Sequence, residues 1–71
     1  MRVHLRHMRQ LRYCTRGVRQ FFAKRGFDYP DFLKNGIEAE RMIATGDAMA
    51  LATVRVAEDE QRGRLAAELP L

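Results

Sequence analysis

The side chains that most often bind metals or act as nucleophiles are scarce in this sequence. His4, His7 and Cys14 are its only histidines and its only cysteine. A structural zinc site needs about four ligands at suitable spacing, and a catalytic thiolate needs a base that a third group orients. Asp28 and Asp31 resemble an acid–base pair, but both are typical of the first turn of a helix. The sequence therefore predicts no metal site, no cofactor, no small-molecule substrate and no catalysis.

The strongest chemical signal is a run of basic residues at the beginning of the chain. The first 25 residues hold eight positive charges and no acid, and six arginines recur at gaps of three or four residues. Such gaps place side chains on one face of an α-helix, and the planar guanidinium matches phosphate and carboxylate groups. We expect five of these arginines to contact a polyanion or an acidic partner: Arg6, Arg9, Arg12, Arg16 and Arg19.

Charge is distributed unevenly along the chain, whose net charge is +4. Residues 1–35 hold nine basic and two acidic residues, whereas residues 36–71 hold four basic and seven acidic ones. This asymmetry is typical of a protein that binds a polyanion, or of electrostatic contact between copies. A third interpretation stays open, in which the arginines form a solvated face that contacts the acidic half of the same chain.

A chain of 71 residues supports one small domain, which buries roughly 60% of its unfolded surface. We expect an all-α fold, a small bundle of three to five short helices, with residues 1–58 as the domain and residues 59–71 as a flexible tail or arm. The single cysteine fits a reducing compartment. No apolar run is long enough to cross a membrane, and arginine and histidine interrupt the segment where a signal peptide needs an apolar core. We therefore expect an intracellularly made protein with no membrane partner.

The apolar pattern divides the basic segment into two helices. The apolar residues before and after residues 13–15 point in different directions on a single helical wheel. Gly17 also disfavours an uninterrupted helix, by ~1 kcal/mol relative to alanine. We expect a short helix over about residues 4–12 and a second over about residues 16–25, with Thr15 as its N-cap. Cys14 is expected as a buried thiol on the face of Leu11 and Val18.

Residues 2–5 alternate polar and apolar side chains, so a short extended N-terminal segment stays open as an alternative to helix. Further along, Asp28 is expected to cap a helix over residues 29–34, which Gly36 ends. A helical turn over residues 38–44 is expected to direct Ile37, Met42 and Ile43 inward. Asp47 is expected to cap a helix over residues 48–58; residues 51–56 also fit a strand by their β-branched content.

The segment 48–58 is apolar almost all round, so it either forms the central helix or meets another chain. We expect contacts with a partner or a second copy from Met49, Leu51, Val54 and Val56. Leucines at positions 65, 69 and 71 are suited to an arm that orders on a neighbour. The expected core consists of Leu11, Val18, Phe21, Phe22, Phe27, Phe32, Ile37, Ile43, Met49 and Val54.

Six short segments have a familiar order and spacing: residues 3–8, 13–17, 21–22, 26–29, 32–37 and 44–50. Together they resemble small open reading frames of tailed bacteriophages and prophages. The resemblance covers about residues 3–57. It implies a phage-encoded accessory, assembly or virion component, made in the cytoplasm of a bacterial host and, as a virion component, incorporated into the particle. It assigns no functional residue.

The preferred interpretation is a non-catalytic phage-type interaction protein. It would be a small virion-structural or assembly component that docks on other protein subunits, either further copies of itself or other phage proteins. The first alternative is a basic nucleic-acid-binding accessory protein that uses the arginine-rich N-terminal face. The second alternative is a binder or inhibitor of a host protein.

Overall fold

The computed structural model describes residues 1–68, and the side chains of residues 1–64. In chain order the elements are β1 (Arg2–Val3), α1 (Leu5–Gln10), α2 (Thr15–Lys24), α3 (Tyr29–Asn35), β2 (Ile37–Glu38), α4 (Ala39–Ala44) and α5 (Ala48–Glu68). The predicted all-α fold with a short N-terminal extended segment is confirmed.

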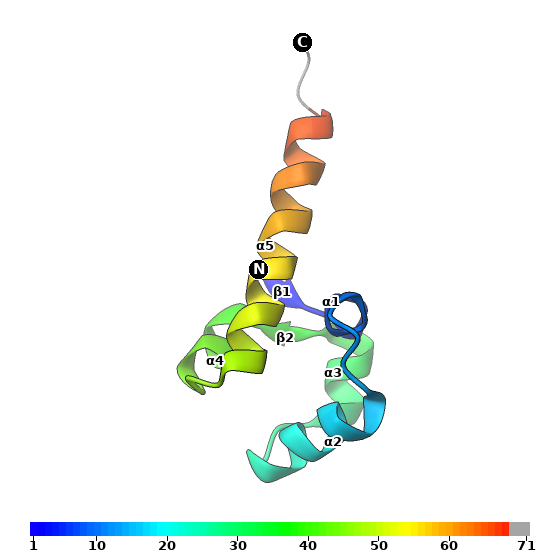
Figure 1. Ribbon diagram of the computed structural model, residues 1–71, viewed down its shortest axis with the longest axis vertical. Helices are drawn as coiled ribbons and strands as arrows, with labels where there is room; N and C mark the ends of the chain where they lie inside the picture. Colours follow the sequence, from blue (N-terminus) through cyan, green and yellow to red (C-terminus); the bar gives the residue numbers. More distant parts are fainter. Residues whose placement is uncertain (69–71) are drawn as a thin grey trace.

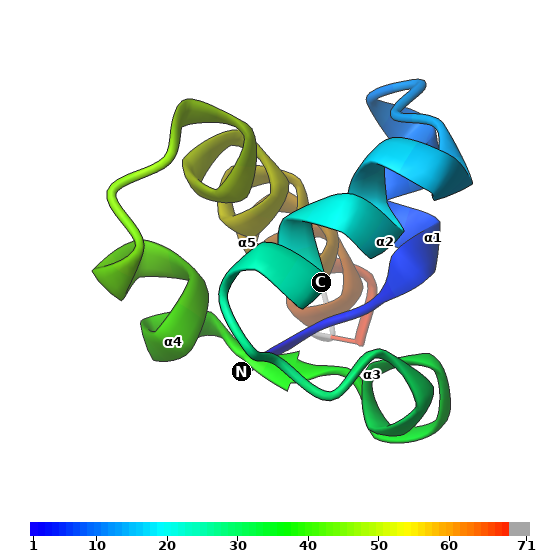
Figure 2. The same cartoon turned by 90° about the horizontal axis from the view of Figure 1, so that it is seen from below.

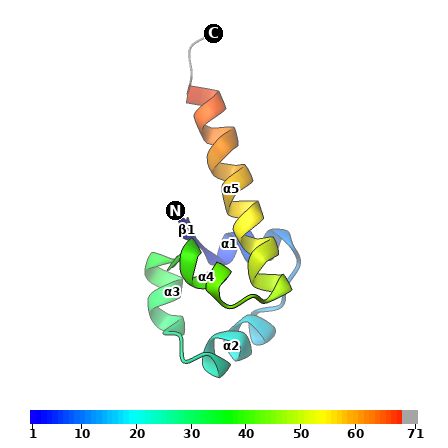
Figure 3. The ribbon, with the colours of Figure 1, turned by 90° about the vertical axis from the view of Figure 1, so that its left-hand side faces the viewer.

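The molecule is elongated because α5 runs along its longest dimension. Helices α1 to α4 surround the N-terminal half of α5, and the C-terminal half projects away from them (Figure 1, Figure 3). The principal extents are 46 × 23 × 21 Å. Seen from below, α2, α3 and α4 lie around the base of α5 (Figure 2). The fold is therefore a small helical body with one protruding helix.

Two of the predicted helix caps are confirmed. The Asp28 carboxylate accepts the backbone N–H of Asp31 at 3.0 Å, and Asp47 Oδ1 accepts the N–H groups of Met49 and Ala50 at 2.8 and 3.3 Å. These bonds satisfy donors that the first turn of a helix leaves unpaired.

The N-cap of α2 differs from the prediction. Cys14, not Thr15, occupies this position, and its Sγ accepts the N–H of Gly17 at 3.3 Å. Because the cap lies outside the helix, Cys14 is exposed, and the predicted buried thiol is wrong.

The strands β1 and β2 connect the N-terminal segment of the chain to the segment between α3 and α4. They pair antiparallel, with Arg2 opposite Glu38 and Val3 opposite Ile37. Gly36, at φ 76°, allows this approach because an added Cβ would lie 2.7 Å from the His4 ring and 2.8 Å from the Val3 carbonyl oxygen. The open question at residues 2–5 is thereby answered: a short strand precedes α1.

Phe22 lies at the centre of the core and is fully buried. Its ring centroid is 4.4 Å from that of Phe32, 5.6 Å from that of Phe27 and 5.8 Å from that of Tyr29. These rings come from α2, from α3 and from the turn between the two helices. One aromatic side chain therefore holds together two short helices that would not be stable alone.

The core differs from the predicted one at several positions. Leu11, Phe27 and Met49 are only partly buried, whereas Val3 and Met8, which the prediction left out, are fully buried. Ile43 is 48% exposed, because neighbouring helix positions point about 100° apart and Met42 takes the inward one.

Helix α5 is longer than the predicted helix over residues 48–58. It continues to Glu68, so residues 59–68, expected as a tail or arm, belong to the same helix. The strand alternative for residues 51–56 is excluded. Leu69 and Leu71 lie outside the described residues, and the side chain of Leu65 is not described.

Replacement of Phe22 by alanine tests this core. We expect Phe22→Ala to lower the free energy of unfolding by about 3 kcal/mol or more, because it removes a buried ring and leaves a cavity. Urea denaturation followed by circular dichroism measures the change. Leu33→Ala is the control, since Leu33 is 49% exposed, and we expect a change within about 0.5 kcal/mol. A Phe22→Ala protein as stable as the wild type would contradict this assignment of the core.

Candidate functional site

All five predicted contact arginines are exposed, but four of them have no acidic partner among the described side chains. Arg9, Arg12, Arg16 and Arg19 are all exposed, and none forms an ion pair with an acid among the described side chains. They belong to α1, the loop after it and α2, and these two helices follow one another on one side of the molecule (Figure 2). We call these four residues the arginine surface.

The part of the arginine surface on α2 forms one face of an amphipathic helix. Val18, Phe21 and Phe22 are buried, whereas Arg16 and Arg19 are exposed. Gln20, Ala23 and Lys24 are exposed as well, so the helix presents basic and neutral side chains and no acid. The Arg19 guanidinium lies 5.6 Å from the centroid of the Tyr29 ring. A guanidinium over a ring face keeps its N–H groups available to an anion.

Arg12 has an unusual backbone conformation. Its φ is 62°, the only positive φ among the non-glycine residues described. It ends α1: the Arg12 N–H donates to the Arg9 carbonyl at 2.9 Å, and the Tyr13 N–H donates to the Met8 carbonyl at 3.2 Å. This is a Schellman motif, which usually has glycine at this position.

The C-terminus of α2 forms a second Schellman motif, and here glycine occupies the left-handed position. There Gly26, at φ 69°, donates to the Ala23 carbonyl, and the N–H of Phe27 donates to the Phe22 carbonyl. Arginine in the left-handed region costs roughly 1–2 kcal/mol relative to an ordinary helical conformation. Backbone strain at an exposed residue is a feature of binding sites, so Arg12 is the strongest single candidate of the arginine surface.

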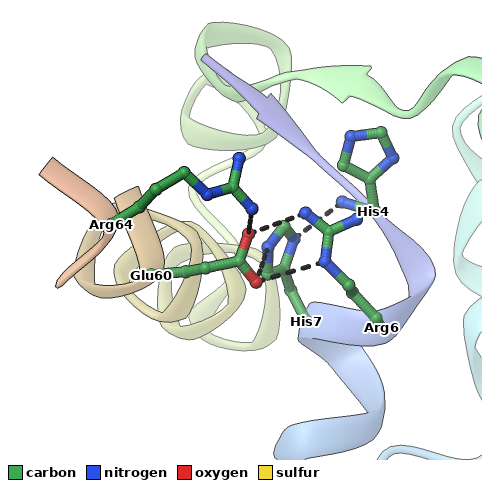
Figure 4. Close-up of polar contacts among 5 residues, drawn as sticks. All are labelled: His4, Arg6, His7, Glu60 and Arg64. Atoms are coloured by element: carbon green, nitrogen blue, oxygen red, sulfur yellow. Dashed lines mark hydrogen bonds and ion pairs between the residues drawn. The ribbon is translucent and has the colours of Figure 1, made fainter. Parts of the chain in front are cut away.

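Arg6 does not belong to the arginine surface. Its Nε and Nη2 bind the two carboxylate oxygens of Glu60 at 3.1 and 2.7 Å (Figure 4). The bidentate pair connects α1 to α5 across 54 residues of sequence. The contact follows the interpretation in which an arginine meets the acidic half of its own chain, so Arg6 is set apart from the four arginines that have no acidic partner among the described side chains.

The same carboxylate faces two further side chains. Glu60 Oε2 lies 3.1 Å from Nε2 of His7, and Oε1 lies 3.6 Å from Nη2 of Arg64 (Figure 4). His7 is 2% exposed. Its Nδ1 accepts the backbone N–H of His4 at 2.9 Å, so the proton of the neutral ring lies on Nε2, toward Glu60. The Nε2–Oε2 pair is close but is not aligned as a hydrogen bond, so the attraction is mainly electrostatic.

This arrangement changes the ionisation of Glu60 and His4. The hydrogen bonds from the Arg6 side chain, reinforced by His7, lower the pKa of Glu60 to about 2. Burial, followed by the charge of Arg6, lowers the pKa of His4 from 6.5. Sequence reasoning missed the Glu60 cluster; the acidic run 58–60 was the available signal, but it did not indicate which acid turns toward α1.

The predicted partner residues on α5 divide into two groups. Val54 is 3% exposed, which confirms its place in the expected core, so only its second assignment, to a partner contact, is wrong. Leu51 is 43% exposed, and Met49 and Val56 are partly buried. A groove of about 450 Å³ runs beside these residues; it is lined by Leu11, Ala48, Leu51, Ala52, Arg55, Val56 and Asp59.

Among the side chains of residues 1–64, no three of His, Cys, Asp or Glu gather closely enough to hold a metal ion. Within residues 1–68, no helix combines the length and the apolar character needed to cross a membrane.

Comparison with family models, with curated proteins and with solved structures produced no match.

Substitution of Arg12 by glycine tests whether the backbone is strained at this position. We expect Arg12→Gly to raise the free energy of unfolding by about 0.5–1 kcal/mol, because glycine adopts positive φ without steric cost. Arg9→Gly is the control within α1, and there we expect a loss of about 0.5–1 kcal/mol. Denaturation curves measure both variants. A destabilised Arg12→Gly protein would show that Arg12 does not hold the left-handed conformation.

The Glu60 cluster predicts a defined pH dependence. The pKa of Glu60 is about 2 in the folded chain against an ordinary value of 4.5, so its charged form stabilises the fold above about pH 4.5 and loses this effect as the pH falls toward 2. We expect Glu60→Gln to lower Tm clearly at pH 7 and the difference from wild type to disappear near pH 2. Glu58→Gln, exposed and unpaired among the described side chains, is the control. A Tm difference that is equal at both pH values would contradict the assignment.

Proposed function

We propose that this chain is a non-catalytic interaction protein that docks on an acidic surface of another protein subunit through the arginine surface. The proposal includes the phage context: a small virion-structural or assembly component. The order and spacing of the phage-like segments between residues 3 and 57 support this context. The observation that carries the proposal is the imbalance between free arginines and free acids.

Most acids of the chain are already engaged. Six of those with described side chains accept hydrogen bonds or ion pairs within the chain: Asp28, Asp31, Glu38, Asp47, Asp59 and Glu60. Glu40 and Glu58 are the described acids without such a contact, and both are exposed. Asp28 and Asp31 accept only from neutral N–H groups and keep their charge, so four carboxylates without an ion pair stand against eight basic side chains without one, among the described side chains. A second copy is therefore a poor electrostatic match for the arginine surface. The complementary charge must come from a different molecule.

Residue types favour a protein as that molecule. Arginine and tyrosine are enriched where protein interfaces hold most of their binding energy. Tyr13 is partly buried and lies in sequence between Arg12 and Arg16. The Schellman turn fixes the backbone at Arg12 before any partner binds, so binding there need not order the main chain. A carboxylate on the partner would form the bidentate pair that Arg6 forms with Glu60.

Nucleic acid is the second candidate, and the exposed face of α2 favours it. Arg16, Arg19 and Gln20 recur at helical spacing on a helix without acids, as in helices that contact phosphates and base edges. The next helix does not extend this surface. Exposed Asp28 and Asp31 stand at the beginning of α3, where a recognition helix would approach the DNA and would be repelled.

Mass spectrometry of purified phage particles tests the proposal. We expect the chain to be present, with amine-reactive cross-links from Lys24, which is exposed on α2, to an acidic subunit. Arg16→Glu is expected to reduce incorporation about tenfold, since it replaces an attractive contact by a repulsive one. The fold tolerates this variant because an acid is favourable in the first turn of a helix. Lys34→Glu, the same charge change on α3, is the control and should incorporate normally.

Titration with duplex and single-stranded DNA separates the second candidate. Binding to phosphates weakens by roughly one log unit of affinity per log unit of salt for each phosphate contacted. A chain that is absent from particles but binds DNA in this salt-dependent way supports the nucleic-acid candidate instead. A chain that is absent from particles and does not bind DNA contradicts both candidates. If the chain instead forms a complex with a host protein, and Arg16→Glu abolishes that complex, the chain is a binder of a host protein.

A further inference from the structure

Helix α5 has two different sides, and only one of them is covered by its own chain. Ala50, Thr53, Val54 and Ala57 point into the core and are buried. On the opposite side lies the groove beside α1, with Leu51 43% exposed at its edge. By helical geometry, Ala48, Ala52, Arg55 and Asp59 share this second side. The groove is therefore a mostly apolar surface along the N-terminal half of α5.

Beyond Glu60, the described part of α5 is not covered by the rest of its chain. Residues 61–64 are all exposed, and the helix projects beyond the body in two perpendicular views (Figure 1, Figure 3). An isolated helical segment of this length is marginal in water. The groove is thus an apolar surface that no helix covers, and the projecting segment is a helix that no surface supports. One could therefore bind the other.

Gly63 adds a second observation about the projecting half. It lies within α5, where glycine costs about 1 kcal/mol relative to alanine. A Cβ built on Gly63 meets nothing within 4 Å, so no contact in its own chain requires the missing side chain. A small residue does allow a neighbouring helix to approach closely.

The charges on the second side of α5 select an antiparallel arrangement. Arg55 and Asp59 are one turn apart and line the same groove. Two antiparallel copies of α5 whose two-fold axis passes at the level of residue 57 place each Arg55 opposite Asp59 of the second copy. The same register brings Gly63 of one copy to the level of Leu51 of the other, where a residue without a side chain leaves room for the leucine. In a parallel pair, by contrast, each arginine would face an arginine.

We propose that the C-terminal half of α5 from a second copy occupies the groove between α1 and α5, which gives an antiparallel two-fold dimer. Each copy supplies both the groove and the occupant, as an isologous interface requires. The ion pair of Asp59 with Arg62, at 3.2 Å, is exposed and competes only weakly. The dimer would display two arginine surfaces, and thereby increase avidity for a repeated acidic partner. The proposed dimer does not depend on the proposed function.

Charge reversal combined with sedimentation equilibrium tests the dimer and its register. The full chain is expected to dimerise with a dissociation constant below about 1 mM. Arg55→Asp and Asp59→Arg should each weaken dimerisation about tenfold, because each places like charges opposite one another twice. The double variant Arg55→Asp with Asp59→Arg restores opposite charges and should return to within about threefold of wild type.

Leu51→Asp and Leu33→Asp form a matched pair of further variants. Both leucines are exposed, at 43% and 49%, but only Leu51 lines the groove. Leu51→Asp should abolish the dimer, and Leu33→Asp should leave it unchanged; circular dichroism confirms that each variant is folded. A wild-type chain that stays monomeric at about 1 mM, a double variant that fails to recover, or equal effects at the two leucines would overturn the proposal.

Discussion

The contact between Glu60 and the first helix is the interaction on which the organisation of this small protein depends. Helix α1 has six residues, too few to persist alone, and α5 would otherwise leave the body after its last buried residue, Ala57. Glu60 binds Arg6 through both carboxylate oxygens and lies against the buried His7. One carboxylate therefore orients the beginning of the chain against its longest helix. The depressed pKa of Glu60 is the electrostatic consequence of this arrangement.

This contact also determines which charges remain for other molecules. It removes Arg6 from the basic series, as the pair with Glu38 removes Arg2. The remaining cations concentrate on α2 and the loop that precedes it, where no acid of the described chain reaches them. The Schellman turn at Arg12 redirects the chain between the two basic helices. A basic helix that looks continuous in sequence thereby becomes two short helices at an angle, and the arginine surface follows the bend.

Helix α5 relates the two proposed interactions. Its first half completes the core and forms the groove, and its second half extends away from the body. A dimer through this helix would leave α2 free, so that assembly with a second copy and docking on an acidic subunit would use different surfaces. Neither requires a reactive group. This division fits a chain whose described histidines serve the packing of α1 and whose exposed Cys14 serves as a helix cap.

Local sequence determined the elements of this protein more completely than their contacts. Asp28 and Asp47 predicted helix starts because capping acts over two or three residues, and the apolar phase change predicted the break between α1 and α2. The tertiary structure alone decided that Ile43 faces solvent, that Val54 is a core residue and not also a partner contact, and that α5 continues past Glu58, since these depend on which side of a helix its neighbours cover. The tertiary structure also decided which charged side chains form ion pairs within the chain. Whether an arginine is free depends on an acid such as Glu60, 54 residues away from Arg6, and periodicity in a sequence carries no information about such distant pairs.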